Sequence, residues 1–174
     1  MPQNTFSFVN RRFFLSRFAA LGILFTLLLS GCAGKESAPE SRFVLLDGSS
    51  TTTRDLQGKV MLVNFWATTC VTCVKEMPDL VDTYNKFQAK GFDTIAVAMA
   101  YDRPDWVLHF AQTRQLPFKV ALDNTGEVAT AWGDVKLTPT TYLVDRQGRI
   151  VKRYIGEPDF AALHELIEKL LADT

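Results

Sequence analysis

Residues 60–78 read VMLVNFWATTCVTCVKEMP, an apolar run that leads directly into two cysteines. The run Val60–Phe65 is rich in β-branched residues, which predicts a buried strand. Cys70 and Cys73 follow where a helical pattern begins, and the free N–H groups and dipole of a helix N-terminus favour a thiolate. Because two residues separate the cysteines, their sulfurs can meet across one helical turn. The stretch therefore predicts a reactive dithiol at the junction of a strand and a helix.

The composition fits one compact domain and points away from nucleic acid as a partner. The chain has 174 residues, of which 47% are hydrophobic, and this is enough for a single core. Its formal net charge is zero, so no basic surface predicts nucleic-acid binding. Three arginines and no acidic residue precede Cys32, which leaves 16 basic and 19 acidic residues in the rest of the chain. That part therefore carries a small negative charge.

The N-terminus has the pattern of an export signal. Three arginines within residues 11–17 supply a basic region, and the twelve residues Phe18–Leu29 form an apolar one. A bilayer span needs ~20 apolar residues, so a cleaved signal fits better than a membrane helix. The sequence LSGC at residues 29–32 resembles a bacterial lipobox, which implies that Cys32 is lipidated and becomes the new N-terminus. An uncleaved signal anchor is the alternative, and both place the remaining chain outside the cytoplasm and attached to a membrane.

The sequence NRRFFLS at residues 10–16 also resembles the twin-arginine export motif, with ordinary secretory export as the alternative. Residues 33–41 contain no large apolar side chain, which predicts a flexible tether. The predicted organisation is an export signal over residues 1–31, a lipidated N-terminus and tether over residues 32–41, and one folded domain over residues 42–174.

The folded part predicts elements in the order β-β-α-β-α-β-α-β-β-α, which indicates an α/β fold with a central mixed β-sheet flanked by helices. The longest expected helix, residues 71–89, has apolar residues every three or four positions. Asp102 is the expected N-cap of the next helix. The expected strands are residues 43–46, 60–65, 92–99, 118–122, 139–145 and 149–155, and the other helices are about residues 102–116, 126–132 and 157–171.

These motifs resemble the thioredoxin-like fold, and in particular the TlpA/ResA type of membrane-tethered, extracytoplasmic thiol-disulfide oxidoreductase. The similarity covers residues 43–171 and includes a strand–helix insertion of this type at residues 102–120. The residues that carry the resemblance are VNFWA at 63–67, CVTC at 70–73, Glu76, and TPT at 138–140.

The resemblance implies a role for each of these residues. Cys70, nearer the helix end, would attack a disulfide, and Cys73 would resolve the mixed disulfide. Pro139 matches the family's cis-proline beside the dithiol, and a cis X–Pro bond costs little. Thr138 would face the sulfurs. Together, Thr138, Pro139 and Trp66 would form the groove for the substrate.

Two further residues match the reductase branch of the family. Glu76 matches an acid that modulates the protonation of the cysteines, and Asn64 stands where cytoplasmic thioredoxins carry a buried Asp. A first-turn acid favoured by the helix dipole is the alternative explanation for Glu76. The chain departs from the family at Thr69, where Trp is usual, and at Val71-Thr72, which lacks the usual Pro before the second cysteine. Both departures touch residues that set the redox poise, so the direction of electron flow stays open.

The expected function is the reduction of disulfides in extracytoplasmic proteins, for example apocytochrome c, by a chain anchored to the membrane through Cys32. The expected redox group is the Cys70–Cys73 disulfide, with no metal or other cofactor, because there is no second cysteine pair and His109 and His164 fall on separate helices. The expected partners are protein disulfides and a membrane thiol donor that re-reduces the dithiol. The chain is expected to act as a monomer.

Three other functions are compatible with parts of this pattern. A periplasmic disulfide oxidant or isomerase is the main alternative, and the redox potential would separate it from a reductase. A thiol peroxidase of this fold would need Pro and Thr at the positions of Val63 and Ala67. A copper-handling protein would need a longer cysteine spacing and a nearby His. The sequence therefore favours a thiol-disulfide oxidoreductase.

Overall fold

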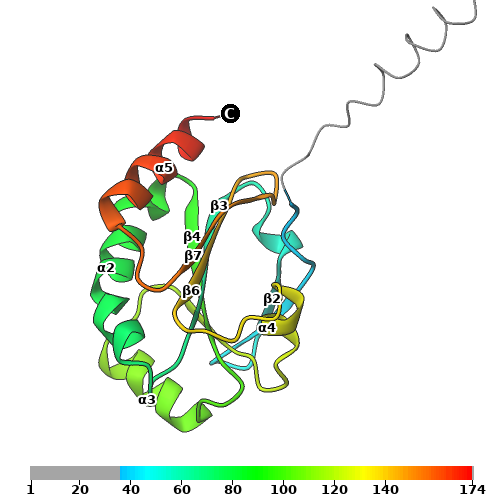
Figure 1. The fold of residues 1–174 in the computed structure, drawn as a ribbon, viewed down its shortest axis with the longest axis vertical. Coiled ribbons are helices and arrows are strands. Elements are labelled where there is room, and N and C mark those ends of the chain that lie inside the picture. The colour runs from blue at the N-terminus through cyan, green and yellow to red at the C-terminus, as the bar shows by residue number, and fades with distance from the viewer. Residues whose placement is uncertain (1–35, 174) are drawn as a thin grey trace, which may run out of the picture. The chain divides into compact units, whose positions relative to one another are not determined.

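The computed structural model describes residues 36–173, which form one seven-stranded sheet with helices on both faces (Figure 1). The predicted export signal, Cys32 and the start of the predicted tether lie outside the described residues. Among residues 36–173, no helix is long and apolar enough to cross a membrane. The strands are β1 (Arg42–Leu45), β2 (Ser50–Thr52), β3 (Val60–Trp66), β4 (Phe92–Ala98), β5 (Lys119–Leu122), β6 (Thr140–Val144) and β7 (Ile150–Ile155). The helices are α2 (Val71–Phe87), α3 (Pro104–Thr113), α4 (Glu127–Ala131) and α5 (Phe160–Ala172), with short 3₁₀ turns at Arg54–Leu56 and Gln88–Lys90.

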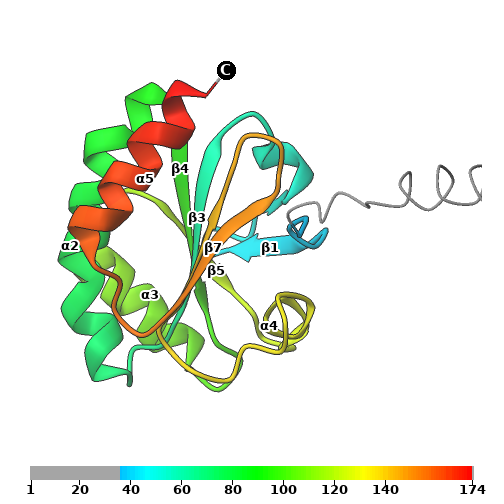
Figure 2. The same ribbon diagram turned by 45° about the horizontal axis from the view of Figure 1, so that its top comes forward.

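The sheet is mixed, which confirms the prediction. Its strand order is β2-β1-β5-β4-β3-β6-β7. The strands β3, β4 and β5 run parallel to one another, whereas β1 is antiparallel to β5 and β6 is antiparallel to β3. The helices α2, α3 and α5 cover one face of the sheet, and α4 lies on the other (Figures 1 and 2). This arrangement places β3 inside the sheet, between β4 and β6.

β3 divides the core into two layers. Alternate side chains of a strand point to opposite faces, so Leu62 and Trp66 join the cluster that includes α2, α3 and α5, while Val63 and Phe65 join the α4 cluster. Every residue of β3 is buried. Burial on both faces explains why this strand has an almost continuous apolar sequence. By the same alternation Asn64, the polar residue of the strand, shares the α2 face.

The short edge strand β2 is not predicted by the sequence. Its three residues, Ser50–Thr52, pair antiparallel with β1. The segment has no apolar residue, so hydrophobic periodicity does not detect it. Its β-branched threonines nevertheless suit the extended backbone of a strand at the edge of a sheet.

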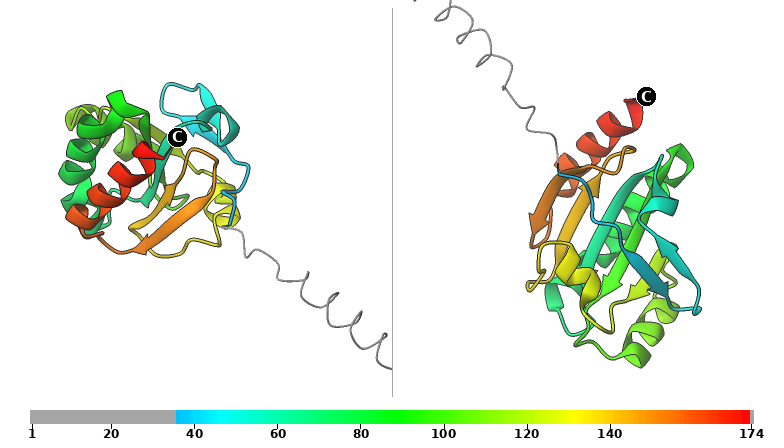
Figure 3. Two further views of the ribbon diagram at one scale, coloured as in Figure 1. Left: turned by 90° about the horizontal axis from the view of Figure 1, so that it is seen from above. Right: turned by 90° about the vertical axis from the view of Figure 1, so that its right-hand side faces the viewer.

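The segment before β1 is held on the domain, which corrects the predicted tether for residues 36–41. The Ala38 N–H group donates a hydrogen bond to the Gly148 carbonyl at 2.8 Å, and the Ile150 N–H group donates to the Glu36 carbonyl at 2.7 Å. These bonds attach the segment to the hairpin formed by β6 and β7, and it lies on the α4 side of the sheet (Figure 3). Composition alone misses such pairing because the backbone, not an apolar side chain, makes it. The described domain therefore starts near residue 36 rather than residue 42.

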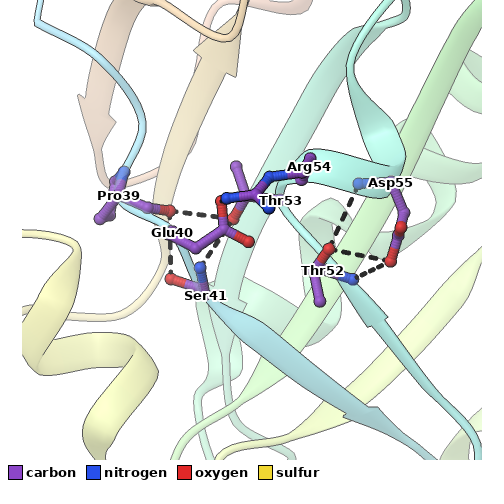
Figure 4. Close-up of polar contacts among 7 residues, drawn as sticks. All are labelled: Pro39, Glu40, Ser41, Thr52, Thr53, Arg54 and Asp55. Carbon is purple, nitrogen blue, oxygen red and sulfur yellow. Dashed lines mark hydrogen bonds and ion pairs between the residues drawn. The ribbon is translucent and has the colours of Figure 1, made fainter.

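Side chains reinforce this attachment next to β1. The Ser41 N–H group donates to Thr53 Oγ1 at 3.0 Å, and the Thr53 hydroxyl donates to the Pro39 carbonyl at 2.9 Å (Figure 4). Trp132 Nε1 donates to Ser41 Oγ at 3.0 Å, and both side chains are buried. The polar residues of the segment are therefore satisfied by the domain, as buried polar groups require.

A chain that begins at Arg42 should be less stable than one that begins at Glu36. The shorter chain loses two backbone hydrogen bonds to the β6–β7 hairpin and the contacts of Ser41. Since each such bond contributes about 1 kcal/mol, we expect a loss of roughly 2 to 4 kcal/mol in the free energy of unfolding. Urea unfolding of both chains in the oxidised form, followed by circular dichroism, measures this difference. Equal midpoints would mean that residues 36–41 behave as a tether after all.

Candidate active site

Cys70 and Cys73 form a disulfide at the first turn of α2, directly after β3. Their Cα atoms are 5.2 Å apart. Cys70 is the N-cap residue of the helix, and its Sγ accepts the Cys73 N–H group at 3.2 Å. After reduction the same N–H group would stabilise a Cys70 thiolate, because the first N–H groups of a helix have no partner within the helix. The structure thus brings the two predicted cysteines together at a helix N-terminus.

The two sulfurs differ in their access to solvent. Cys73 is fully buried, whereas Cys70 is partly buried and the adjacent Val71 side chain is 84% exposed. A protein disulfide that approaches from solvent therefore meets Cys70 before Cys73. This difference fits Cys70 as the attacking sulfur and Cys73 as the resolving one.

Strand pairing brings the Thr138-Pro139 loop to the same end of the sheet as the dithiol. β6 runs antiparallel to β3 with Thr140 opposite Phe65, so the start of β6 adjoins the end of β3. The Thr138–Pro139 peptide bond is cis, with Pro139 buried and Thr138 half-buried. Tyr101 Oη lies 3.2 Å from Thr138 Oγ1 and joins this loop to the segment after β4. No motif in the sequence identifies Tyr101, which can be recognised only as an aromatic residue shortly after a predicted strand.

Trp66 does not line the groove, which corrects the prediction from the sequence. Its side chain is fully buried, and its ring lies 5.1 Å from the Phe110 ring between centroids. Its position in β3 alternates with that of Phe65, so it points into the layer beneath α2 and α3. Trp66 therefore packs in the core next to the site and does not contact a client protein.

Glu76 is held by the central strands of the sheet. Its Oε1 accepts a hydrogen bond from Asn64 Nδ2 at 3.0 Å, and the same amide group donates to Thr141 Oγ1 at 2.9 Å. All three side chains are fully buried, and Glu76 Oε2 has no hydrogen-bond partner among the described residues. Glu76 follows Cys73 by three residues on α2, so both side chains share the buried face of the helix. The structure thus brings Asn64, Glu76 and the dithiol into one region.

Burial raises the pKa of Glu76 to about 7, because the carboxylate loses its hydration inside the protein. The hydrogen bond from Asn64 opposes this shift, whereas the negative charges of Glu157 and Asp79 add to it. Glu76 can therefore gain or lose a proton near neutral pH. An acid that only complemented the helix dipole would have remained exposed and charged, so the burial of Glu76 argues against that explanation.

Asp102 anchors the loop that carries Cys70, a role that the sequence analysis missed. It is the expected N-cap of α3, but the helix begins at Pro104 with Arg103 as its N-cap. The buried Asp102 carboxylate instead accepts the Thr68 N–H group at 2.5 Å and the Thr68 hydroxyl at 2.6 Å. β3 and β4 are parallel neighbours, so the loops that follow them meet at one edge of the sheet. That adjacency is the signal that could have identified the pair.

The histidines lie apart from each other, as the sequence predicts, with His109 on α3 and His164 on α5. His164 Nε2 lies 2.8 Å from Thr83 Oγ1, so its ring is engaged with α2. Within residues 36–173, no three His, Cys, Asp or Glu side chains form a group that could hold a metal ion.

Replacing Glu76 by Gln should make the oxidised protein more stable at alkaline pH. The pKa of Glu76 in the folded protein, about 7, lies above its ordinary value, so the wild-type protein is most stable when Glu76 is protonated. Its stability falls as the pH rises from about 4.5 to about 7, by about 3 kcal/mol in total, and a neutral Gln avoids this loss. Urea unfolding at about pH 5 and about pH 8 measures the effect.

The matched control is Asp82→Asn, which removes an exposed acid from the same helix. This variant should keep nearly the wild-type dependence of stability on pH. If the wild-type protein and Glu76→Gln lose the same stability between the two pH values, the raised pKa of Glu76 is wrong.

Comparisons with known proteins agree with this site. A family model described as Redoxin matches residues 33–167. The thiol-disulfide oxidoreductase ResA of Bacillus thuringiensis subsp. konkukian is 35% identical over 137 residues, which cover 79% of this chain and 78% of that protein. ResA of Bacillus subtilis is 33% identical over 164 residues, which cover 91% of this chain and 89% of that protein.

A comparison with solved structures finds a protein of similar fold. The crystal structure of a thiol:disulfide interchange protein of the thioredoxin family from Chlorobium tepidum matches with a TM-score of 0.74 and 24% sequence identity. The match covers 82% of this chain and 100% of that chain. The predicted thioredoxin-like fold is therefore confirmed. The chain is a thiol-disulfide oxidoreductase that belongs to the redoxin family, with the ResA proteins among its relatives.

Proposed function

We propose that this oxidoreductase works as a reductase of disulfides in extracytoplasmic proteins, with Cys70 as the attacking sulfur and Cys73 as the resolving one. The observation that carries the proposal is the asymmetry of the dithiol. Cys70 is accessible at the N-terminus of α2, whereas Cys73 is buried on the helix face that also holds Glu76. In such a pair the accessible Cys70 can attack a client disulfide, and the buried Cys73 can then attack Cys70 Sγ to complete the exchange.

The exchange proceeds in two balanced steps. The Cys70 thiolate attacks one sulfur of the client disulfide, a bond forms between Cys70 and the client, and the other client sulfur leaves as a thiolate. Cys73 then loses its proton and attacks Cys70 Sγ, which forms the Cys70–Cys73 disulfide and releases the second client sulfur. The two client thiolates take up two protons, of which one balances the proton lost by Cys73 and the other comes from solvent, because Cys70 reacts as a thiolate. Two electrons and one proton thus pass from the enzyme to the client.

Glu76 is the proposed acceptor of the Cys73 proton. A thiol in apolar surroundings keeps its proton, because burial disfavours the thiolate. A carboxyl with a pKa of about 7, one turn along the same helix face, can take that proton at neutral pH. The free Oε2 atom offers the accepting lone pair, while Oε1 stays bound to Asn64. Glu76 thereby helps Cys73 to become the second nucleophile.

The oxidised enzyme must be reduced again before another cycle. We propose that a membrane thiol donor supplies the electrons, since an oxidising compartment offers none. Lipidation at Cys32, indicated by the lipobox-like sequence LSGC, would hold the domain on the extracytoplasmic face of the membrane near this donor. We propose that the chain acts as a monomer. Clients would be proteins with unwanted disulfides, for example the haem-binding cysteines of apocytochrome c.

The variant Cys73→Ser should trap mixed disulfides between Cys70 and its clients. Without Cys73 the first step can still occur, but nothing attacks Cys70 Sγ to release the client. Expression in an exporting bacterial host, followed by non-reducing electrophoresis and mass spectrometry, would reveal adducts that disappear on addition of dithiothreitol. The identity of the trapped proteins would name the clients.

The matched control is Cys70→Ser, which keeps the buried thiol and removes the accessible one. It should trap few or no clients, because Cys73 cannot reach a protein disulfide from its buried position. If Cys70→Ser traps the same clients to the same extent, the assignment of Cys70 as the attacking sulfur is wrong.

A further inference from the structure

A groove runs between α2 and α3 and begins beside the active-site loop. One hollow, with a volume of about 380 Å³, has Thr69 at one end and Trp106 of α3 in its wall. A second hollow, of about 240 Å³, continues along α2 as far as Val81. Both are lined by Phe110 and Arg114, so they form one continuous surface feature, which we call the α2–α3 groove. Figures 1 and 2 show these two helices next to each other on one face of the sheet.

The groove opens beside the residue that precedes the attacking sulfur. Thr69 carries a small, exposed side chain directly before Cys70 and lines the first hollow. Trp106 lines the hollow beside it and is still 48% exposed. A single aromatic side chain in contact with a hollow and with solvent can pack against an apolar group of a partner. The loop that precedes Cys70 therefore ends in an apolar recess.

The rest of the groove combines an apolar floor with one cation. Val74, Met77 and Phe110 supply apolar contacts along α2 and α3. The Arg114 guanidinium lies 5.7 Å from the Phe110 ring centroid and forms no ion pair with a carboxylate among residues 36–173. Asp82 lies in the second hollow, at the opposite wall on α2. The cation on the α3 wall is therefore available to an acidic group of a partner.

The position of the groove relative to the sheet separates it from the Thr138-Pro139 loop. This loop comes before β6, on one side of β3, whereas α3 follows β4, on the other side. The two surfaces thus flank the loop that carries Cys70. A client whose disulfide lies at Cys70 can extend from there into the groove.

We infer that the α2–α3 groove binds the segment of the client polypeptide that flanks the reacting disulfide, in an extended form, with a bulky apolar side chain against Trp106 and an acidic side chain facing Arg114. This inference rests on the proposed function and adds to it a preference among client sequences. An extended polypeptide fits because the groove runs along α2 from Thr69, the neighbour of Cys70 in the chain, to Asp82. Its apolar floor and single cation match a segment of mixed character.

Two synthetic peptides test this preference. Each contains one intramolecular disulfide flanked by Phe, and they differ only in a neighbouring residue, which is Glu in one and Lys in the other. Glutathione disulfide, which has no long polypeptide segment on either side of its disulfide, serves as the third substrate. The variants Arg114→Glu and Trp106→Ala are compared with the wild-type enzyme. The matched control is Arg42→Glu, which reverses the charge of an exposed arginine on β1. The measurements are kcat and KM for each substrate under steady reduction.

The wild-type enzyme should have a lower KM for the Glu peptide than for the Lys peptide. Arg114→Glu should raise the KM for the Glu peptide by about tenfold and lower the KM for the Lys peptide. Trp106→Ala should raise the KM of both peptides by about fivefold. Neither variant should change kcat/KM for glutathione disulfide, and Arg42→Glu should change nothing.

Equal effects of Arg114→Glu on both peptides would overturn the inference. So would an equal loss of activity with glutathione disulfide and with the peptides, which would indicate general damage to the site. A wild-type dimer in light scattering that Arg114→Glu dissociates would identify a second copy of the chain as the occupant of the groove. If the enzyme reduces glutathione disulfide but Arg114→Glu and Trp106→Ala leave the KM of both peptides unchanged, the inference is wrong and the proposed function stands. If the wild-type enzyme reduces none of the three substrates, the proposed function itself is wrong.

Discussion

The hydrogen bond from the Cys73 N–H group to Cys70 Sγ is the contact on which the site depends. It exists because β3 is buried on both faces and leads directly into α2, so that Cys70 occupies the N-cap position. The N–H groups of the first helical turn have no carbonyl partner in the helix, and a sulfur anion is a suitable acceptor. The reactivity of Cys70 is therefore a consequence of where the helix begins.

Burial then distinguishes the two cysteines. Cys70 can be reached from solvent, whereas Cys73 lies on the helix face that packs against the sheet and carries Glu76. A carboxyl in such a place costs stability, because only one of its oxygens is hydrogen-bonded and the charged form is poorly solvated. Functional sites commonly retain groups that reduce stability. The bond from Asn64 keeps this carboxyl oriented, while Oε2 has no hydrogen-bond partner among the described residues.

Local patterns in the sequence predicted the parts of the fold that depend on apolar periodicity and on the dithiol. They predicted the buried strand β3, the helix α2 and the mixed sheet, whereas the cis bond at Pro139 was expected from the family resemblance. They did not predict β2 or the attachment of residues 36–41, because backbone hydrogen bonds and polar side chains form both. The direction of Trp66 and the anchoring role of Asp102 depend on which strands and helices are neighbours in space. Spacing along the chain contains little of that information.

The central claim is that the Cys70–Cys73 couple is a reductant, and its reduction potential tests this claim most directly. The protein is equilibrated with glutathione or dithiothreitol buffers of known potential, and its free thiols are quantified by alkylation and mass spectrometry. A reductase should have a potential between about −200 and about −300 mV, in the range of glutaredoxins and thioredoxin. A potential near about −120 mV, typical of a strong disulfide oxidant, would contradict the account.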